Sequence, residues 1–252
     1  MKRITIALTA AVLAAACSDS TGPAAESGVS LSFTSGAGGA AAAPGAFFSI
    51  MSDTLSDGSN ELILTKVEVV LREIELKRQS APGCVEEDDC EKFETGPILV
   101  DVPLNGETET VITISPDPDT YDELEFDIHK VSNDDPEDAA FRSAHPDMVG
   151  KSIRVQGSYN GQPFTYETDL DVEQEFDLVP PLVVTAEATS TNVTVLLGVD
   201  QWFRDGSGNL VNPQDGNKGG QHESLVKENI KQSIEAFEDE DHDGDDDSED
   251  NS

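Results

Sequence analysis

The feature that most constrains the fold of this chain is a series of short segments in which apolar and polar residues alternate, each followed by a turn signal. Val29–Thr34 alternates strictly, as a strand does when one face is buried. Asn160 and Gly161 stand between two further segments, Ile153–Tyr159 and Phe164–Tyr166. Because both turn residues tolerate positive φ, this pair predicts a β-hairpin. The other segments are Leu62–Lys77, Ile98–Val102, Thr110–Ile114, Tyr121–Ile128, Val172–Leu178, Leu182–Ala186 and Val193–Val199. Together they predict an all-β chain, an antiparallel β-sandwich of the immunoglobulin-like or a related type.

The segment Leu62–Lys77 fits two structures. Val69 and Leu71 share one face of a strand, but Ile74 and Leu76 lie at the other parity, so a strand here requires a β-bulge. Apolar residues also recur at intervals of three and four, as on an amphipathic helix. The many β-branched residues and the strands expected on either side favour a strand.

One helix is expected near the end of the chain. His222–Phe237 places Leu225, Ile230 and Ile234 toward one face at helical spacing. From Glu238 to Asp250 the chain holds ten acidic residues in thirteen positions and no apolar residue. Such a segment has nothing to bury. We therefore expect a single domain over residues 29–237 with a helix over about 222–237, and a disordered acidic tail over 238–252.

The N-terminus has the pattern of an export signal. Lys2 and Arg3 precede an uncharged, mostly apolar run that ends at residue 16, which is too short to span a bilayer as a stop-transfer helix. Small residues stand directly before Cys17, and this arrangement resembles the lipobox of bacterial lipoproteins, in which the cysteine is acylated. An ordinary signal peptide is the alternative. Residues 1–16 are thus the predicted signal peptide and residues 17–28 a lipidated tether.

A resemblance extends beyond the lipobox. Leu64–Val69, the segment Asp119–Leu124 centred on Tyr121, and Val193–Val195 leading into Trp202 are similar to segments of uncharacterised bacterial lipoproteins that carry a secreted β-sandwich domain of unknown function. The resemblance implies a secreted, membrane-anchored β-domain and supplies no catalytic residues. Ser18, rather than an aspartate, follows the cysteine, which is similar to the sorting pattern of the outer membrane in Gram-negative cells.

Two further cysteines, Cys84 and Cys90, enclose four consecutive acidic residues. In an exported protein the simplest expectation is a disulfide that closes a tight loop and stabilises the fold by about 2 kcal/mol. The alternatives are a zinc site, which lacks further cysteine or histidine ligands at short spacing, and a cation held by the enclosed carboxylates. A solvated acidic hairpin tip is the simpler interpretation of those carboxylates.

The tail also contains the spacing D-x-D-x-D-G, which is typical of calcium loops. Alternate carboxylates in such a loop converge on one ion, and the glycine permits the sharp turn. Against a calcium site, an acidic residue, Asp246, replaces the usual apolar one, and so acidic a segment produces this spacing by composition. The candidate Ca²⁺ ligands are Asp239, Asp241, Asp243, Asp245, Asp247 and Asp250.

Two features near residue 205 have a functional and a structural interpretation. Trp202, the single tryptophan, is either a stacking platform for a ligand or a core residue, and the second is the more common role. Asp205, Ser207 and Asn209 offer oxygens at alternate positions, as a cation loop does. A glycine-rich turn explains the same residues, and we favour it.

Charge and motifs limit the function. The formal net charge of −36 argues against nucleic acid and anionic lipid headgroups as partners. The sequence shows no zinc-hydrolase, nucleophile-elbow, P-loop or dinucleotide motif, and its four histidines form no such set. We expect a non-enzymatic lipoprotein with a structural or binding role at the cell envelope, its protein or glycan partner unidentified. A calcium-responsive adhesion or glycan-binding module is the alternative, and a hydrolase is the third.

Overall fold

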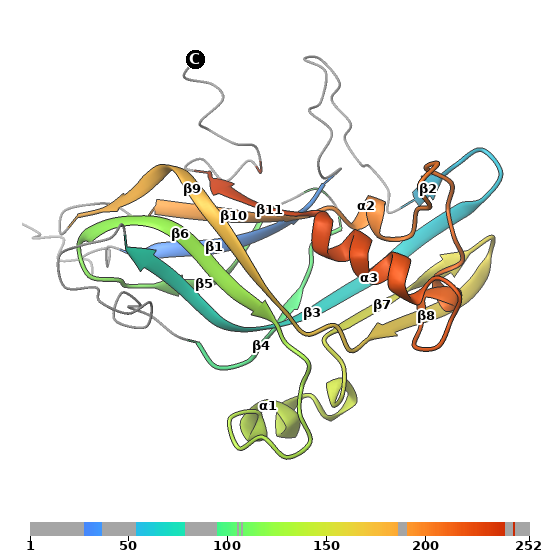
Figure 1. The fold of residues 1–252 in the computed structure, drawn as a ribbon, viewed down its shortest axis with the longest axis horizontal. Helices are drawn as coiled ribbons and strands as arrows, with labels where there is room; N and C mark the ends of the chain where they lie inside the picture. The colour runs from blue at the N-terminus through green and yellow to red at the C-terminus, as the bar shows by residue number, and fades with distance from the viewer. Residues whose placement is uncertain are drawn as a thin grey trace, which may run out of the picture.

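Two β-sheets form the body of the molecule (Figure 1). The computed structural model describes residues 28–36, 54–78, 95–104, 106, 108–185, 191–239 and 244. Within these residues the strands are β1 (Val29–Ser35), β2 (Thr54–Ser56), β3 (Glu61–Arg78), β4 (Ile98–Asp101), β5 (Glu109–Ile114), β6 (Asp119–Ile128), β7 (Ile153–Tyr159), β8 (Gln162–Thr168), β9 (Val172–Val184), β10 (Thr191–Leu197) and β11 (Ile234–Glu238). The predicted all-β sandwich is confirmed.

The helices of the described residues are short. They are α1 (Ala139–Ala144), α2 (Val199–Trp202) and α3 (Glu223–Gln232), with the 3₁₀ turns η2 (Pro146–Met148) and η3 (Pro213–Gly216). Within this part of the chain, none of them has the length and apolar character that crossing a membrane requires.

The smaller sheet has the strand order β11-β10-β1-β5, and the larger has β8-β7-β3-β6-β9, with β2 and β4 also paired to β3. The pairs are antiparallel except that of β1 with β10, which is parallel. This one pair departs from the antiparallel arrangement that the sequence predicted. The paired residues, such as Val29 and Thr191, are far apart in the sequence, which carries no local signal of the relative direction of the two strands.

The core lies between the two sheets. Phe33 of the smaller sheet and Tyr121, Phe126 and Tyr166 of the larger are fully buried. Trp202, on α2, is also fully buried, and its indole Nε1 donates to Ser233 Oγ at 2.9 Å. Burying a large apolar side chain stabilises the fold by about 1.5–3 kcal/mol. The four residues on strands belong to segments in which the sequence alternates, whereas Trp202 lies outside them.

β3 has the bulge that its sequence requires. Glu73 adopts a φ of +52°, and the register with β6 shifts between Arg72 and Glu75. As a result Leu71 and Leu76, which have opposite parity, are both buried in the core. The strand interpretation of this segment is confirmed and the helix is excluded.

The Asn160-Gly161 hairpin is also confirmed. Both residues have positive φ, +50° and +75°, and they join β7 to β8, with Tyr159 paired to Gln162. Asn160 also bonds this turn to the start of β3, since its Oδ1 accepts from Glu61 N at 2.9 Å.

β9 differs from the prediction. The two expected segments, 172–178 and 182–186, form one strand that continues through Pro180 and Pro181 to Val184. Proline donates no ladder hydrogen bond and is confined to edge strands. In the described structure β9 pairs with β6 alone, so it is an edge strand and tolerates both prolines.

The opposite edge of the larger sheet, β8, is capped by a side chain. Asn217 Oδ1 accepts from Glu167 N at 2.8 Å, and Asn217 Nδ2 donates to Thr165 O at 3.2 Å. The side-chain amide thus bonds the backbone of β8 as a peptide group of a neighbouring strand does.

The C-terminal helix is shorter than predicted. α3 ends at Gln232, and the residues from Ile234 onward form β11, which pairs with β10. Ile234 and Phe237 fit a helical period, but antiparallel pairing with β10 determines their conformation. The predicted boundary of the tail also differs, since Glu238 belongs to β11 and Asp239 is fully buried.

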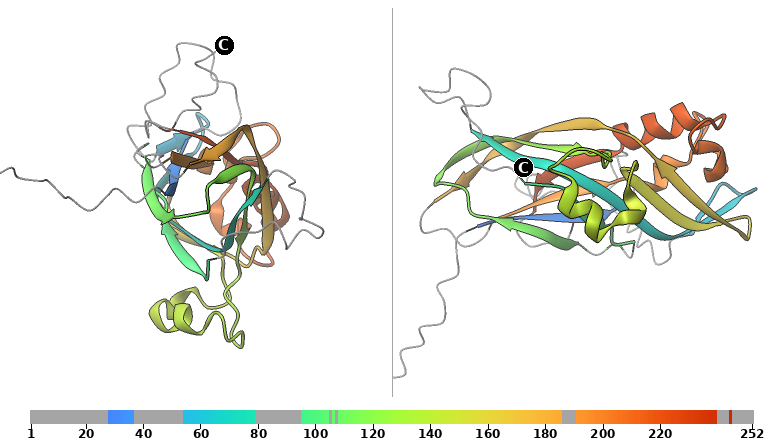
Figure 2. Two further views of the ribbon diagram at one scale, coloured as in Figure 1. Left: turned by 90° about the vertical axis from the view of Figure 1, so that its left-hand side faces the viewer. Right: turned by 90° about the horizontal axis from the view of Figure 1, so that it is seen from below.

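A separate small unit connects β6 to β7. It contains α1 and η2, which lie outside the two sheets (Figures 1 and 2). Val131, Phe141 and Met148 pack there on Val70 of β3, in a cluster separate from the main core. His129 Nε2 lies 2.9 Å from both carboxylate oxygens of the fully buried Asp138, and this pair fixes the unit where it leaves β6.

Candidate functional site

Most of the residues predicted to form sites lie outside the described residues. These are the lipidation cysteine Cys17, the proposed disulfide pair Cys84 and Cys90, and the tail residues Asp241, Asp243, Asp245, Asp247 and Asp250. The disulfide and the full calcium loop therefore remain predictions.

Asp239, the first residue of the predicted calcium loop, is described and is fully buried. Its Oδ2 accepts from Thr194 Oγ1 at 2.7 Å and from the backbone N of Gly244 at 3.1 Å. Gly244 has a φ of +87°, which favours glycine. The first and sixth positions of the D-x-D-x-D-G spacing are thus joined by a hydrogen bond.

A polar network on the outer face of the smaller sheet holds Asp239 in place. Asn192 Nδ2 donates to Thr194 Oγ1 at 2.8 Å, and Ser32 Oγ donates to Asn192 Oδ1 at 2.6 Å. Thr110 Oγ1 lies 2.9 Å from the same Ser32 hydroxyl. Side chains of β5, β1 and β10 therefore form a continuous chain of hydrogen bonds that ends at a buried carboxylate, which requires such partners.

A second group of carboxylates lies on the outer face of the larger sheet. The antiparallel register of β6 and β9 places three acidic pairs directly opposite one another. We call this set the carboxylate ladder, and its pairs are Glu123 with Asp177, Glu125 with Glu175, and Asp127 with Glu173. Like charges directly opposite each other destabilise a sheet. The ladder therefore concentrates repulsion on one face.

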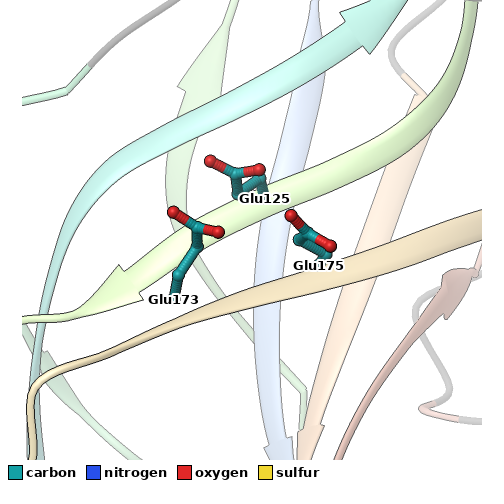
Figure 3. Close-up of side chains that lie close together, drawn as sticks. All are labelled: Glu125, Glu173 and Glu175. Atoms are coloured by element: carbon teal, nitrogen blue, oxygen red, sulfur yellow. The ribbon is translucent and has the colours of Figure 1, made fainter. Parts of the chain in front are cut away.

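Three members of the ladder come close enough to share a cation (Figure 3). Carboxylate oxygens of Glu125, Glu173 and Glu175 lie within 4.8 Å of one another. Calcium takes six to eight oxygen ligands, so these three side chains supply part of a coordination shell and water would have to supply the rest.

Two basic side chains of β3 offset the repulsion in the ladder. Lys77 contacts the carboxylates of both Glu123 and Glu125, and the distance to Glu123 Oε1 is 3.3 Å. Arg72 NH2 lies 3.8 Å from Asp127 Oδ2. Burial, followed by the charge of Glu73, raises the pKa of Asp127 to about 6, although the Arg72 guanidinium acts in the opposite direction.

The sequence contains a signal for the ladder that we did not use. Acidic residues alternate with apolar or neutral ones in two segments, over residues 123–127 and 173–177. Alternation predicts that each set shares one strand face. The pairing of β6 with β9 was needed to show that the two sets lie side by side.

Two of the alternatives considered for the region near residue 205 are resolved. Trp202 is a core residue, which was the favoured interpretation, and it is not exposed as a stacking platform would be. Asp205 forms a turn, because its Oδ1 accepts from the backbone N of Ser207 at 2.8 Å and of Asn209 at 2.9 Å. A hydrogen bond from the side-chain amide of Asn209, together with these two backbone bonds, holds the pKa of Asp205 below its usual range.

Comparisons of the chain with protein-family models, with curated proteins and with solved structures gave no match. The resemblance to bacterial lipoproteins gains no support from them. What the structure itself defines is a two-sheet, all-β sandwich that carries a dense acidic face.

Proposed function

We propose that the protein is a lipid-anchored β-sandwich on the extracytoplasmic side of the membrane, with a non-enzymatic structural or binding role at the cell envelope. The observation that carries this proposal is the sequence of residues 1–17, in which a charged start, an apolar run and small residues precede Cys17. The described sandwich begins at β1, residue 29, so a short tether would separate it from the lipid. Each buried methylene of an acyl chain contributes about 0.8 kcal/mol, and several chains hold a domain firmly on a membrane.

Replacement of the cysteine tests the anchor. In cells that make the full chain, Cys17→Ala should move the protein from the membrane fraction to the soluble fraction and abolish incorporation of a labelled fatty acid. Globomycin should cause the unprocessed precursor to accumulate. Cys84→Ala is the matched control and should stay membrane-bound. If Cys17→Ala leaves both fractionation and labelling unchanged, the anchor is wrong.

A calcium-responsive role is the second candidate. The hydrogen bond from Gly244 N to Asp239 Oδ2 favours it, since this contact closes the segment that carries the calcium-loop spacing. With aspartates at alternate positions, the loop would offer oxygens to one cation, and extracellular calcium modules bind at about 10⁻⁴–10⁻³ M. Such an ion would also neutralise part of the charge of the tail.

Calorimetric titration of calcium into the full chain tests this candidate. Asp243→Asn should weaken binding about tenfold, since it removes a charged ligand of the loop, whereas Glu175→Gln in the carboxylate ladder should not change it. If Glu175→Gln weakens calcium binding and Asp243→Asn does not, the ion binds at the carboxylate ladder instead. An absence of saturable heat in the wild-type chain would remove the calcium role altogether.

A further inference from the structure

A pocket of about 300 Å³ lies at the end of the β7–β8 hairpin that is remote from its turn, and residues that follow η3 also line it. Lys151, Glu167, Thr168, Asp169, Asn217 and Lys218 are among the residues that line it. A volume of this size is at the lower end of the range for small-molecule sites. We call it the lysine pocket.

Four lysines from four segments of the chain converge at this place. Asp169 is the common partner of three of them, with Lys218 Nζ at 2.8 Å, Lys227 Nζ at 2.8 Å and Lys130 Nζ at 4.0 Å. The fourth, Lys151, has its Nζ 2.7 Å from Oε1 of Glu167, another residue that lines the pocket. Lys130 follows β6, and Lys218 follows η3. Lys151 precedes β7, and Lys227 lies on α3.

The ratio of charges here is the reverse of that in other parts of the described structure. Arg72 has carboxylate partners in Glu73, Asp127 and Asp135, and Lys77 has two partners. Here four lysines have three carboxylate partners, Asp169, Glu167 and, for Lys227, also Glu223. In a chain with 51 acidic and 15 basic residues, such a local surplus of lysines points to an anionic ligand.

The lysines retain donors for such a ligand. An ammonium group has three N–H donors. Among the described residues Lys218 bonds Asp169 alone, and its side chain is 77% exposed, so it can turn toward a bound anion. Lys151 uses two donors, for Glu167 Oε1 and for Asp147 O. The carboxylates elsewhere on the protein repel such an anion only weakly, because charges more than a Debye length away, about 8 Å at physiological salt, are largely screened.

We propose that the lysine pocket binds the anionic oxygens, carboxylate or phosphate, of a small polar molecule. Lys218 and Lys151, the two lysines that line the pocket, would contact those oxygens. Lys227 and Lys130 would hold Asp169 away from them by keeping its carboxylate paired. The proposal does not depend on the lipid anchor or on calcium, because it concerns residues of the sandwich alone.

Three sugars of similar size test the proposal: glucose 6-phosphate, glucuronate and, as the neutral control, glucose. Each is titrated at constant ionic strength into the ¹⁵N-labelled full chain in detergent, and the backbone amide shifts of Gly150, Thr168 and Asn217 are followed. We expect saturable shifts with at least one charged sugar and none with glucose. A response to glucose 6-phosphate alone assigns a phosphate ligand, and a response to glucuronate alone assigns a carboxylate ligand.

Variants distinguish the pocket from general charge effects. Lys218→Gln should weaken binding of the active sugar about fivefold, because it removes one charge-assisted contact. Lys151→Gln should act in the same direction. Lys231→Gln is the matched control, an exposed lysine of α3 away from the pocket, and should leave binding unchanged. The proposal is overturned if no sugar binds, if glucose binds as well as the charged sugars, or if Lys231→Gln weakens binding as much as Lys218→Gln.

Discussion

Asp127 and Asp169 are covered to nearly the same extent, with 21% and 18% of their side chains exposed, yet their pKa values shift in opposite directions. Asp127 lies in the carboxylate ladder, where burial and the charge of Glu73 raise its pKa to about 6. Hydrogen bonds from Lys218 and Lys227 hold the pKa of Asp169 far below its usual range. Burial alone therefore does not decide the state of a carboxylate in this molecule. The number and distance of the basic side chains around a carboxylate also determine its pKa.

The largest effect is expected at Asp169. Asp169→Asn removes the common acceptor of three lysines, and we expect a loss of about 3 kcal/mol in the free energy of unfolding at pH 7. Chemical denaturation of the full chain measures it. Glu235→Gln, an exposed acidic residue of β11, is the control and should change little. If both variants lose the same amount, the lysines are not organised by Asp169.

Replacing Asp127 should have the opposite effect and raise the free energy of unfolding at pH 7. Its pKa in the folded chain is raised from 3.8 to about 6, so the folded chain binds more protons than the unfolded chain between these values. Stability from this group is present at low pH and is lost as the pH rises through that window. Asp127→Asn should therefore stabilise the protein by about 2 kcal/mol at pH 7 and give no gain near pH 4. A gain that is equal at both pH values would contradict this assignment.

The smallest effect is expected at Glu175, which faces Glu125 across the ladder. Glu175→Gln removes one like-charge contact and should stabilise the protein by about 0.5 kcal/mol at low ionic strength. Added salt should reduce the gain, because it screens the repulsion in the wild-type chain. Thermal unfolding at two salt concentrations measures both. A gain that grows with salt would mean that repulsion is not its cause.

Local signals in the sequence predicted local structure well. Alternation placed the strands, the change of parity at Ile74 predicted the bulge of β3, and Asn160-Gly161 predicted the β7–β8 hairpin. Each of these depends on residues that are close together in the chain. The described core accordingly consists largely of the residues that the alternation placed on inward faces.

Features that depend on distant residues were missed. The parallel pair of β1 with β10 joins residues that are far apart in the sequence, and β11 forms because β10 offers it an edge. The lysine pocket was missed for the same reason, since its lysines come from four segments and no spacing relates them. The carboxylate ladder is an intermediate case, because the sequence shows both of its halves but not their register.

The two edges of the larger sheet have a consequence for how copies of the protein behave when crowded. At β8 the backbone groups of Thr165 and Glu167 are bonded to the amide of Asn217, and in β9 Pro180 and Pro181 have no N–H to offer. An incoming strand from another copy would find occupied groups on one side and missing donors on the other. Both edges of the larger sheet are therefore poor templates, at these positions, for a strand added from another copy.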